Sequence, residues 1–213
     1  MTRWVLASSN AGKLREFLNG LSDLLARDAI ELVNQGDLGI APAEEPFATF
    51  EENALAKARH ASRASGCAAI ADDSGLCVDA LGGAPGVRSA RYWQDQRSLC
   101  ADAQRAQLDA LDTDEANWRF LVSQVTAPSA AQFRCVIAFV RNADDPAPIV
   151  VQGVWSGRIT GDARGVGGFG YDPIFFVPEL GKMAAELTLE EKHRFSHRGH
   201  ALRAFIQAVS AHR

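Results

Sequence analysis

Short apolar segments that alternate with helical patterns are the feature that most constrains the fold of this chain. Near the start, a buried-strand pattern over residues 3–7 meets a polar loop at 8–12, and a helical pattern begins at Lys13. The same order recurs where a short strand-like segment at 30–33 precedes a loop and a helical pattern over 50–64. Alternation of this kind predicts an α/β domain with helices packed on a sheet.

The second half of the chain adds segments of β-rich composition with turn residues between them. Strands are predicted at residues 118–126, 133–141, 149–159 and 174–177. Helices are predicted at residues 99–111 and 196–211, and Thr49 with Glu52 can cap the earlier helix. Successive strands without intervening helices indicate an antiparallel part of the sheet. We therefore expect an elongated mixed sheet flanked by helices, with two lobes, in a single domain over residues 1–213.

Composition and charge exclude several classes of protein. The chain has 213 residues, 47% of them hydrophobic, which is enough for one domain with its own core. The net charge of −4 comes without a basic block, so nucleic acid is not an expected partner. No apolar run reaches the roughly 18 residues of a membrane span, so a cytoplasmic protein with no membrane partner is expected. The four cysteines are widely spaced, which favours reduced thiols over a metal or redox pair.

Two adjacent carboxylates, Asp72 and Asp73, lie between the apolar segments 68–71 and 76–78. We expect them in an interruption between two short strands. Buried carboxylates need a cation or hydrogen-bond donors, so a hard-metal site is the simplest interpretation. Mg²⁺ prefers oxygen ligands and can be held by one or two carboxylates together with substrate phosphates. An aspartate pair that caps a turn is the alternative.

The loop from Ser8 to Lys13 leads directly into a helix. Small polar residues and Gly12 would let backbone amides approach an anion at the helix N-terminus, where Lys13 adds a full positive charge. The segment does not match the P-loop pattern, and an ordinary capped helix with an exposed lysine is the alternative.

A glycine-rich segment at 165–170 matches the dinucleotide fingerprint by spacing alone. A β-branched and aromatic run follows it instead of a helix, so we reject a dinucleotide site. Phe169 could instead offer an aromatic face to a base and Asp172 a hydrogen-bond acceptor, or the segment could be a tight turn with a core phenylalanine.

Residues 192–200 concentrate cationic and titratable side chains around Ser196, which can cap the last helix. The cluster suits phosphate or base recognition. Its three histidines are poor zinc candidates because Arg194 and Arg198 would repel a cation. A solvated basic helix start is the alternative.

Taken in order, these segments resemble the inosine triphosphate pyrophosphatase family, also described as dITP/XTP pyrophosphatases, over nearly the whole chain. The resemblance is carried by these sequences: LASSNAGK (6–13), FEENA (50–54) with Lys57, IADDSGL (70–76), GGAPGV (82–87), GGFGYDPIF (167–175), Ala184 with Glu186 and Leu187, Lys192 and SHRG (196–199).

The resemblance implies an elongated mixed-sheet α/β fold with a cleft between two lobes and a homodimer that hydrolyses XTP, dITP and ITP to the monophosphate and pyrophosphate. This activity keeps such nucleotides out of DNA and RNA. The implied cofactor is Mg²⁺, held by Glu44 and Asp73, with Asp73 also acting as the catalytic base. The residues implied for substrate binding are Ser8, Ser9, Asn10, Ala11, Gly12, Lys13, Lys57, Ser74, Phe169, Gly170, Tyr171, Asp172, Lys192, His197 and Arg198.

Two other functions stay open at this point. One is a pyrophosphatase for modified pyrimidine or methylated nucleotides, which a substrate panel would separate from the first. The other is a nucleotide sensor without hydrolysis, which the retained acidic residues disfavour. The roles of Asp72 and Glu45 in metal binding are left undecided by the sequence.

Overall fold

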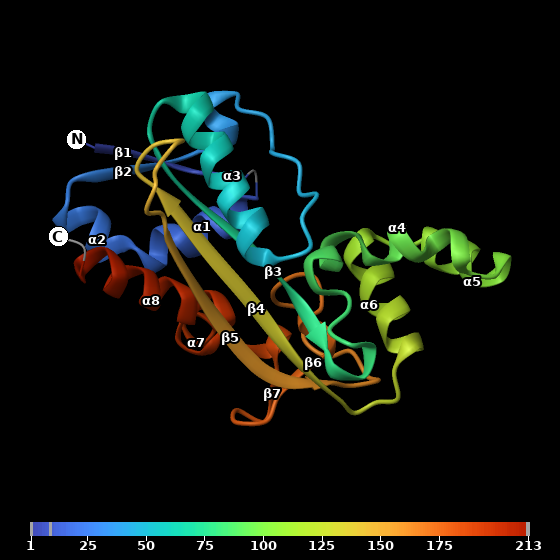
Figure 1. Cartoon of the computed structure of the whole chain (residues 1–213). Coiled ribbons are helices and arrows are strands. Elements are labelled where there is room, and N and C mark those ends of the chain that lie inside the picture. The colour runs from blue at the N-terminus through green and yellow to red at the C-terminus, as the bar shows by residue number, and fades with distance from the viewer. Residues whose placement is uncertain (1, 9, 212–213) are drawn as a thin grey trace. The chain divides into compact units, whose positions relative to one another are not determined.

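The computed structural model describes residues 2–8 and 10–211, and its strands form a mixed seven-stranded sheet. The strands are β1 (Thr2–Leu6), β2 (Ile30–Asn34), β3 (Ala68–Val78), β4 (Ser129–Val140), β5 (Ile149–Ile159), β6 (Phe175–Val177) and β7 (Lys182–Met183). Their order in the sheet is β2-β1-β3-β4-β5-β6-β7 (Figure 1). β1 pairs in parallel with β2 and β3, whereas β6 pairs antiparallel with β5 and β7. The predicted mixed sheet with an antiparallel part is confirmed.

Helices connect or follow most of these strands. The α-helices are α1 (Ala11–Gly20), α2 (Ser22–Arg27), α3 (Phe50–Ser65), α4 (Tyr92–Gln96), α5 (Asp102–Asp109), α6 (Thr113–Gln124), α7 (Leu189–Phe195) and α8 (His197–Ala211). Short 3₁₀ helices occupy Gln35–Leu38, Asp79–Leu81, Gly86–Arg91, Arg97–Leu99, Asp172–Ile174 and Ala184–Glu186. Among the described residues, no helix has the length and apolar character needed to cross a lipid bilayer.

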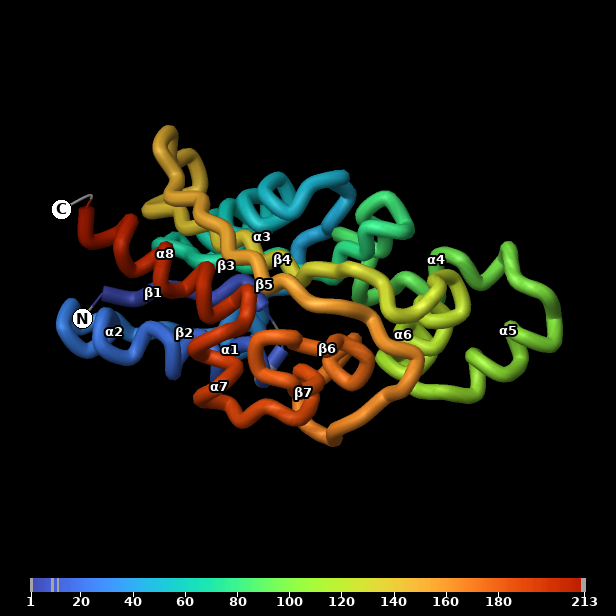
Figure 2. Tube along the Cα trace, turned by 90° about the horizontal axis from the view of Figure 1, so that it is seen from below, coloured from blue at the N-terminus to red at the C-terminus, as the bar shows by residue number. Residues whose placement is uncertain are grey.

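The chain divides into two compact units, and the first comprises the described residues of segments 1–73, 135–154 and 193–213. In this unit α1 and α8 cover one face of the strands and α3 covers the other (Figures 1 and 2). Phe17 and Phe205 from the helices pack with Ile70 and Ile137 from the strands in one buried cluster. On the opposite side α3 presents small buried residues, which lets its backbone approach the sheet: Ala54, Ala58 and Ala61.

The start of α3 matches the predicted cap. The Thr49 hydroxyl accepts a hydrogen bond from the Glu52 N–H at 3.2 Å and donates to the Glu52 carboxylate at 2.7 Å. Gly66 ends the helix in a left-handed conformation, with φ of 69°, that glycine adopts without a steric penalty. These local signals fix the position of Lys57 along the helix.

The second unit comprises segments 74–134 and 155–192 and has its own aromatic core. The Phe175 ring lies 4.6 Å from the Phe133 ring and 5.2 Å from the Trp155 ring, measured between centroids. Phe120 of α6 packs against Tyr92 and Trp93, with centroids 5.3 Å apart in both pairs. This cluster joins the helical segment 92–124 to the strands of the unit.

The strand predicted at residues 118–126 is wrong, because most of that segment belongs to α6. The Asp112 side chain caps this helix by accepting a hydrogen bond from the Glu115 N–H at 2.9 Å. Ala116, Phe120 and Leu121 are buried at helical spacing. The local β-rich composition is overridden by the cap and by burial of one helical face.

Other elements also differ from the prediction. The expected interruption at residues 72–75 does not exist, because β3 runs without a break through both aspartates and Gly75. A Cβ on Gly75 would lie 2.2 Å from the Gly86 carbonyl oxygen, so only glycine permits this close approach. The helix predicted over 99–111 is a 3₁₀ turn followed by the shorter α5, and α7 was not predicted.

Candidate functional site

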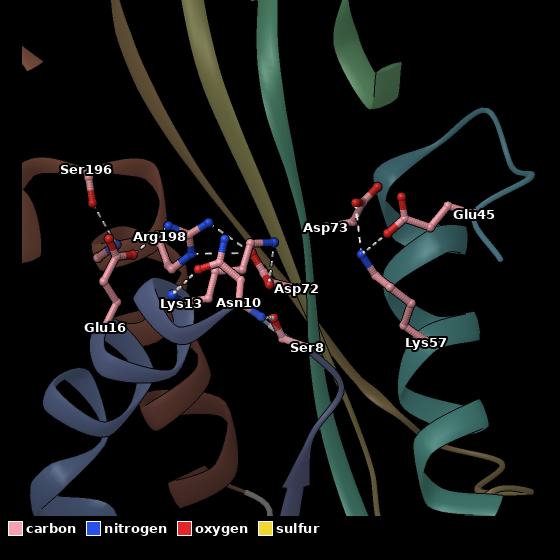
Figure 3. Close-up of polar contacts among 11 residues, drawn as sticks. Ser8, Asn10, Lys13, Glu16, Glu45, Lys57, Asp72, Asp73, Ser196 and Arg198 are labelled. Atoms are coloured by element: carbon pink, nitrogen blue, oxygen red, sulfur yellow. Dashed lines mark hydrogen bonds and ion pairs between the residues drawn. The ribbon is translucent and has the colours of Figure 1, made fainter. Parts of the chain in front are cut away.

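The uninterrupted strand β3 presents Asp72 and Asp73 to opposite faces of the sheet. Successive side chains of a strand alternate between its faces, so two neighbouring aspartates cannot share one face. Asp72 points toward α1 and α8, and Asp73 points toward α3 (Figure 3). Both carboxylates are buried, with 1% and 6% of their residue surface exposed. The first unit therefore holds two separate charged clusters.

Asp72 is the centre of the cluster on the α1 and α8 side. Its Oδ1 accepts a hydrogen bond from Lys13 Nζ at 3.0 Å, and its Oδ2 accepts from Arg198 Nε and Nη2 at 3.3 and 3.1 Å. Arg198 Nη1 also donates to the Glu16 carboxylate at 2.5 Å. Burial acts to raise the pKa of Asp72, but the charges of Lys13 and Arg198 outweigh it and hold that pKa well below its ordinary value.

Asp73 is the centre of the cluster on the α3 side. Its Oδ1 accepts from Lys57 Nζ at 3.0 Å and its Oδ2 from Asn53 Nδ2 at 3.2 Å. Lys57 Nζ also donates to the Glu45 carboxylate at 2.7 Å. Burial raises the pKa of Asp73, and the negative charge of Glu45 adds to this, although Lys57 and Asn53 act in the other direction. A further cation would therefore stabilise the ionised form of Asp73.

The Asp73 cluster has the donor chemistry that a divalent metal requires. Two carboxylates share the single ammonium of Lys57, so one net negative charge is left when both are ionised. Within residues 2–8 and 10–211, no group of three or more histidine, cysteine, aspartate or glutamate side chains could hold a metal by itself. Mg²⁺ is commonly bound by one or two carboxylates together with water and phosphate oxygens, and Asp73 with Glu45 fits that pattern.

The metal ligand predicted beside Asp73 was Glu44, but the structure connects Glu45 to that cluster. Glu44 is exposed on the loop before α3, whereas Glu45 is half-buried and bonded to Lys57. Both glutamates stay candidates for the second metal ligand.

The described residues of the loop before α1 cap that helix with their own side chains. Asn10 Oδ1 accepts a hydrogen bond from the Lys13 N–H at 3.0 Å, and the Asn10 N–H donates to Ser8 Oγ at 3.1 Å. These bonds order the loop and place Lys13 in the first turn of α1, from which its ammonium reaches Asp72 (Figure 3). Ser9 lies outside the described residues. The predicted contact of this loop with phosphates stays a prediction.

In the second unit, the predicted base-binding residues form a linked group. Lys192 Nζ donates to Asp172 Oδ2 at 2.6 Å, and the same oxygen accepts from the Phe169 N–H at 3.2 Å. A Cβ on Gly168 would lie 2.0 Å from that oxygen and 2.3 Å from Lys192 Nζ, so the ion pair requires glycine there. The Phe169 side chain is 46% exposed. An aromatic face is therefore available beside a fixed ion pair.

The remaining predicted site residues differ in their surroundings. Tyr171 is buried, and its hydroxyl donates to the Ser89 carbonyl oxygen at 2.8 Å, so it anchors the loop. Burial raises the pKa of the Tyr171 hydroxyl far above its ordinary value. Ser74 and His197 are partly buried, at the positions after Asp73 and before Arg198. Ser196 caps α8 as predicted, since its Oγ accepts from the Gly199 N–H at 3.2 Å.

The sequence did not lead us to two residues of these clusters: Glu16, which is labelled in Figure 3, and Asn53, which donates to Asp73. Glu16 lies three residues after Lys13 on α1, and Asn53 lies four residues before Lys57 on α3. Residues three or four apart share a face of a helix, so this spacing could have identified both.

The chain matches known proteins over nearly its whole length. Residues 4–208 match the Ham1 family. A dITP/XTP pyrophosphatase of Nitrosomonas europaea is 50% identical over 212 residues, which cover 99% of this chain and 95% of the relative. A dITP/XTP pyrophosphatase of Burkholderia pseudomallei is 53% identical over 207 residues, or 96% of this chain and 92% of the relative.

A solved structure has the same fold. The structure of a HAM1 protein from Coxiella burnetii is 40% identical in sequence, with a TM-score of 0.83, and the match covers 99% of this chain and 100% of the other. Family match, sequence identity and fold agree over nearly the full length, and the predicted family is confirmed: the chain belongs to the Ham1 family.

Proposed function

We propose that this chain hydrolyses the non-standard purine nucleoside triphosphates XTP, dITP and ITP to the monophosphate and pyrophosphate. Hydrolysis of this kind would keep these nucleotides out of DNA and RNA. The observation that carries the proposal is the Asp73 cluster, in which a buried carboxylate with a raised pKa lies beside an ammonium and a second carboxylate. The relatives named dITP/XTP pyrophosphatase support the substrate class.

Asp73 is the proposed catalytic base. It would accept a proton from the water that attacks the α-phosphorus, as a new P–O bond forms and the bond to the bridging oxygen of the pyrophosphate breaks. A base works best when its pKa approaches the working pH, and burial moves the pKa of Asp73 in that direction. Lys57 and Lys13 would offset the negative charge of the phosphates.

The proposed metal is Mg²⁺, held by Asp73 and by a glutamate of the loop before α3. Glu44 is the ligand implied by the family resemblance, and the link through Lys57 makes Glu45 the stronger candidate. When bound, Mg²⁺ would neutralise charge that develops on the pyrophosphate leaving group.

The other substrate contacts are assigned to two groups of residues. The loop at 8–13, together with Lys57 and Ser74, is proposed to contact the triphosphate. Residues 169–172 and Lys192 would hold the base and sugar, with Phe169 offering its exposed ring.

His197 and Arg198 are proposed to recognise the purine oxygen at position six. Arg198 is 3% exposed, and its Nε, Nη1 and Nη2 groups donate hydrogen bonds to the carboxylates of Asp72 and Glu16. A guanidinium is a charged N–H donor, which would favour a purine with an oxygen at position six over a purine with an amino group there.

We propose a single functional domain over residues 1–213, a homodimer and a cytoplasmic location. Gel filtration with light scattering would measure the dimer directly.

The proposed function is tested by measuring pyrophosphate release in the presence of Mg²⁺ by the wild-type and Asp73→Asn proteins. The substrates are ITP, dITP, XTP, GTP, ATP and dTTP. Activity confined to the first three nucleotides and lost in the variant is expected. Activity mainly on modified pyrimidine or methylated nucleotides would replace the proposal with that alternative, and binding of ITP without pyrophosphate release would indicate a sensor. Circular dichroism of the variant controls for folding.

A further inference from the structure

Asp114, in the first turn of α6, holds the glycine-rich loop from a distant part of the sequence. Its carboxylate accepts a hydrogen bond from the Gly170 N–H at 2.7 Å across a separation of 56 residues. The capping of α6 does not require Asp114, since Asp112 already accepts the Glu115 N–H. The hydrogen bond of the Asp114 carboxylate is therefore made to the loop and is not the N-cap of α6.

This bond fixes the backbone on one side of Phe169. On the other side, the Phe169 N–H donates to Asp172 Oδ2 at 3.2 Å. Gly168 and Gly170, which flank Phe169, have φ values of 83° and 61°, in the left-handed region where glycine has wide freedom. Two carboxylates thus hold a backbone that its two glycines would otherwise leave adaptable.

The side chain held in this way is the exposed aromatic ring of the loop. Phe169 is 46% exposed, whereas Tyr171, two residues on, is 4% exposed and hydrogen-bonded to Ser89. The direction of the Phe169 ring depends on the φ and ψ angles of residues 168–170, which the two carboxylates constrain.

We propose that Asp114 is a positioning residue that fixes Phe169 for stacking on the nucleobase, an inference that rests on the proposed function. Loss of the bond lets the loop sample other conformations and lowers the fraction of enzyme ready to bind the base. The effect belongs to substrate binding, because Asp114 touches no group assigned to proton transfer.

Steady-state kinetics with ITP compare the wild type with Asp114→Ala, Asp114→Asn and Glu115→Gln. The amide oxygen of Asp114→Asn still accepts from the Gly170 N–H. Glu115→Gln removes a negative charge from the same turn but leaves the loop bond intact, since Glu115 pairs with Arg119. All assays are run at a temperature where circular dichroism shows every variant folded.

For Asp114→Ala we expect KM to rise about three- to tenfold, the loss typical of one hydrogen bond, with kcat within about twofold of the wild type. Asp114→Asn and Glu115→Gln keep a KM close to the wild-type value. An unchanged KM in Asp114→Ala overturns the inference, and so does an Asp114→Asn protein as impaired as Asp114→Ala. Absence of activity in the wild type would instead overturn the proposed function, so the two failures are distinguishable.

Discussion

Asp72 and Asp73 are neighbours in the sequence, yet their carboxylates lie on opposite faces of β3 and have opposite pKa shifts. Asp72 meets two cations, Lys13 and Arg198, and its ionised form is strongly favoured. Asp73 shares one ammonium with Glu45 and is ionised less readily. The two aspartates therefore differ in role. Asp72 links α1 and α8 to the sheet through ion pairs, whereas the environment of Asp73 suits a metal ligand or a base.

Asparagine at these two positions should affect stability in opposite ways. Asp72→Asn should lower the free energy of unfolding by about 3 kcal/mol or more, because it leaves two cations around a buried position that no longer carries a charge. Asp73→Asn should leave this free energy unchanged or raise it, since burial disfavours the ionised form. Urea denaturation at pH 7 measures both values. Equal destabilisation of the two variants would contradict the division of tasks.

Glutamine substitutions at the neighbouring Glu44 and Glu45 show which of the two glutamates binds the metal. Glu45→Gln should weaken metal binding about tenfold, a loss typical of one charged group of the site, whereas Glu44→Gln should bind as the wild type does. Mn²⁺ binding followed by electron paramagnetic resonance measures this without any turnover. Weaker binding in Glu44→Gln alone would restore the ligand that the family resemblance implies.

Alanine substitutions at Gly168 and Gly181 distinguish the effect of backbone strain from the effect of a steric clash. Both have left-handed φ values, 83° and 64°, but a Cβ meets nothing within 4 Å at Gly181 and collides with the Lys192–Asp172 pair at Gly168. Alanine should cost about 1 kcal/mol of unfolding free energy at either position through strain. Only Gly168→Ala should also raise the KM for ITP, by about tenfold, because the ion pair must separate. Similar KM values in the two variants would remove Gly168 from the site.

The lowered pKa of Asp145 predicts that the free energy of unfolding depends on pH in the acid range. Burial acts against its charge, but hydrogen bonds from Arg141 and Ala147 lower the pKa of Asp145 to about 2. A lowered folded-state pKa stabilises the protein above the ordinary value of 3.8, and this contribution is lost as the pH falls through about 2. Asp145→Asn should be less stable by about 1 to 2 kcal/mol at pH 7.

The difference between wild type and Asp145→Asn should therefore shrink as the pH falls from about 4 to about 2. Asp144→Asn is the control, because the Asp144 side chain is 92% exposed. Thermal melts across this pH range give the comparison. If the difference in stability between wild type and Asp145→Asn does not change with pH, the charge of Asp145 does not stabilise the protein.

Much of the fold could be predicted from local patterns, and the failures have physical causes. The apolar alternation predicted most strands, and the Thr49 and Ser196 caps were placed correctly because capping depends on residues within one turn. Residues 118–126 were predicted as a strand because their β-rich composition outweighed a helix whose stability comes from burial of Phe120 and Leu121.

The site was predicted less completely, because contacts between distant segments leave no local signal. A polar pair such as Asp72-Asp73 usually marks a turn, and the strand continues here because Lys13, Arg198 and Lys57 supply partners from other elements. The hydrogen bond from Gly170 to Asp114 is likewise invisible in the sequence.

The Asp72 cluster also imposes an order on how the protein is made. Arg198 is 126 residues further along the chain than its partner Asp72, and both groups are buried in the finished protein. During synthesis from the N-terminus, Asp72 and Lys13 leave the ribosome long before the helix that carries Arg198. A nascent chain that stops before α8 therefore has Asp72 with Lys13 but without the guanidinium of Arg198, and the ion pairs of this cluster are complete only after α8 has been made.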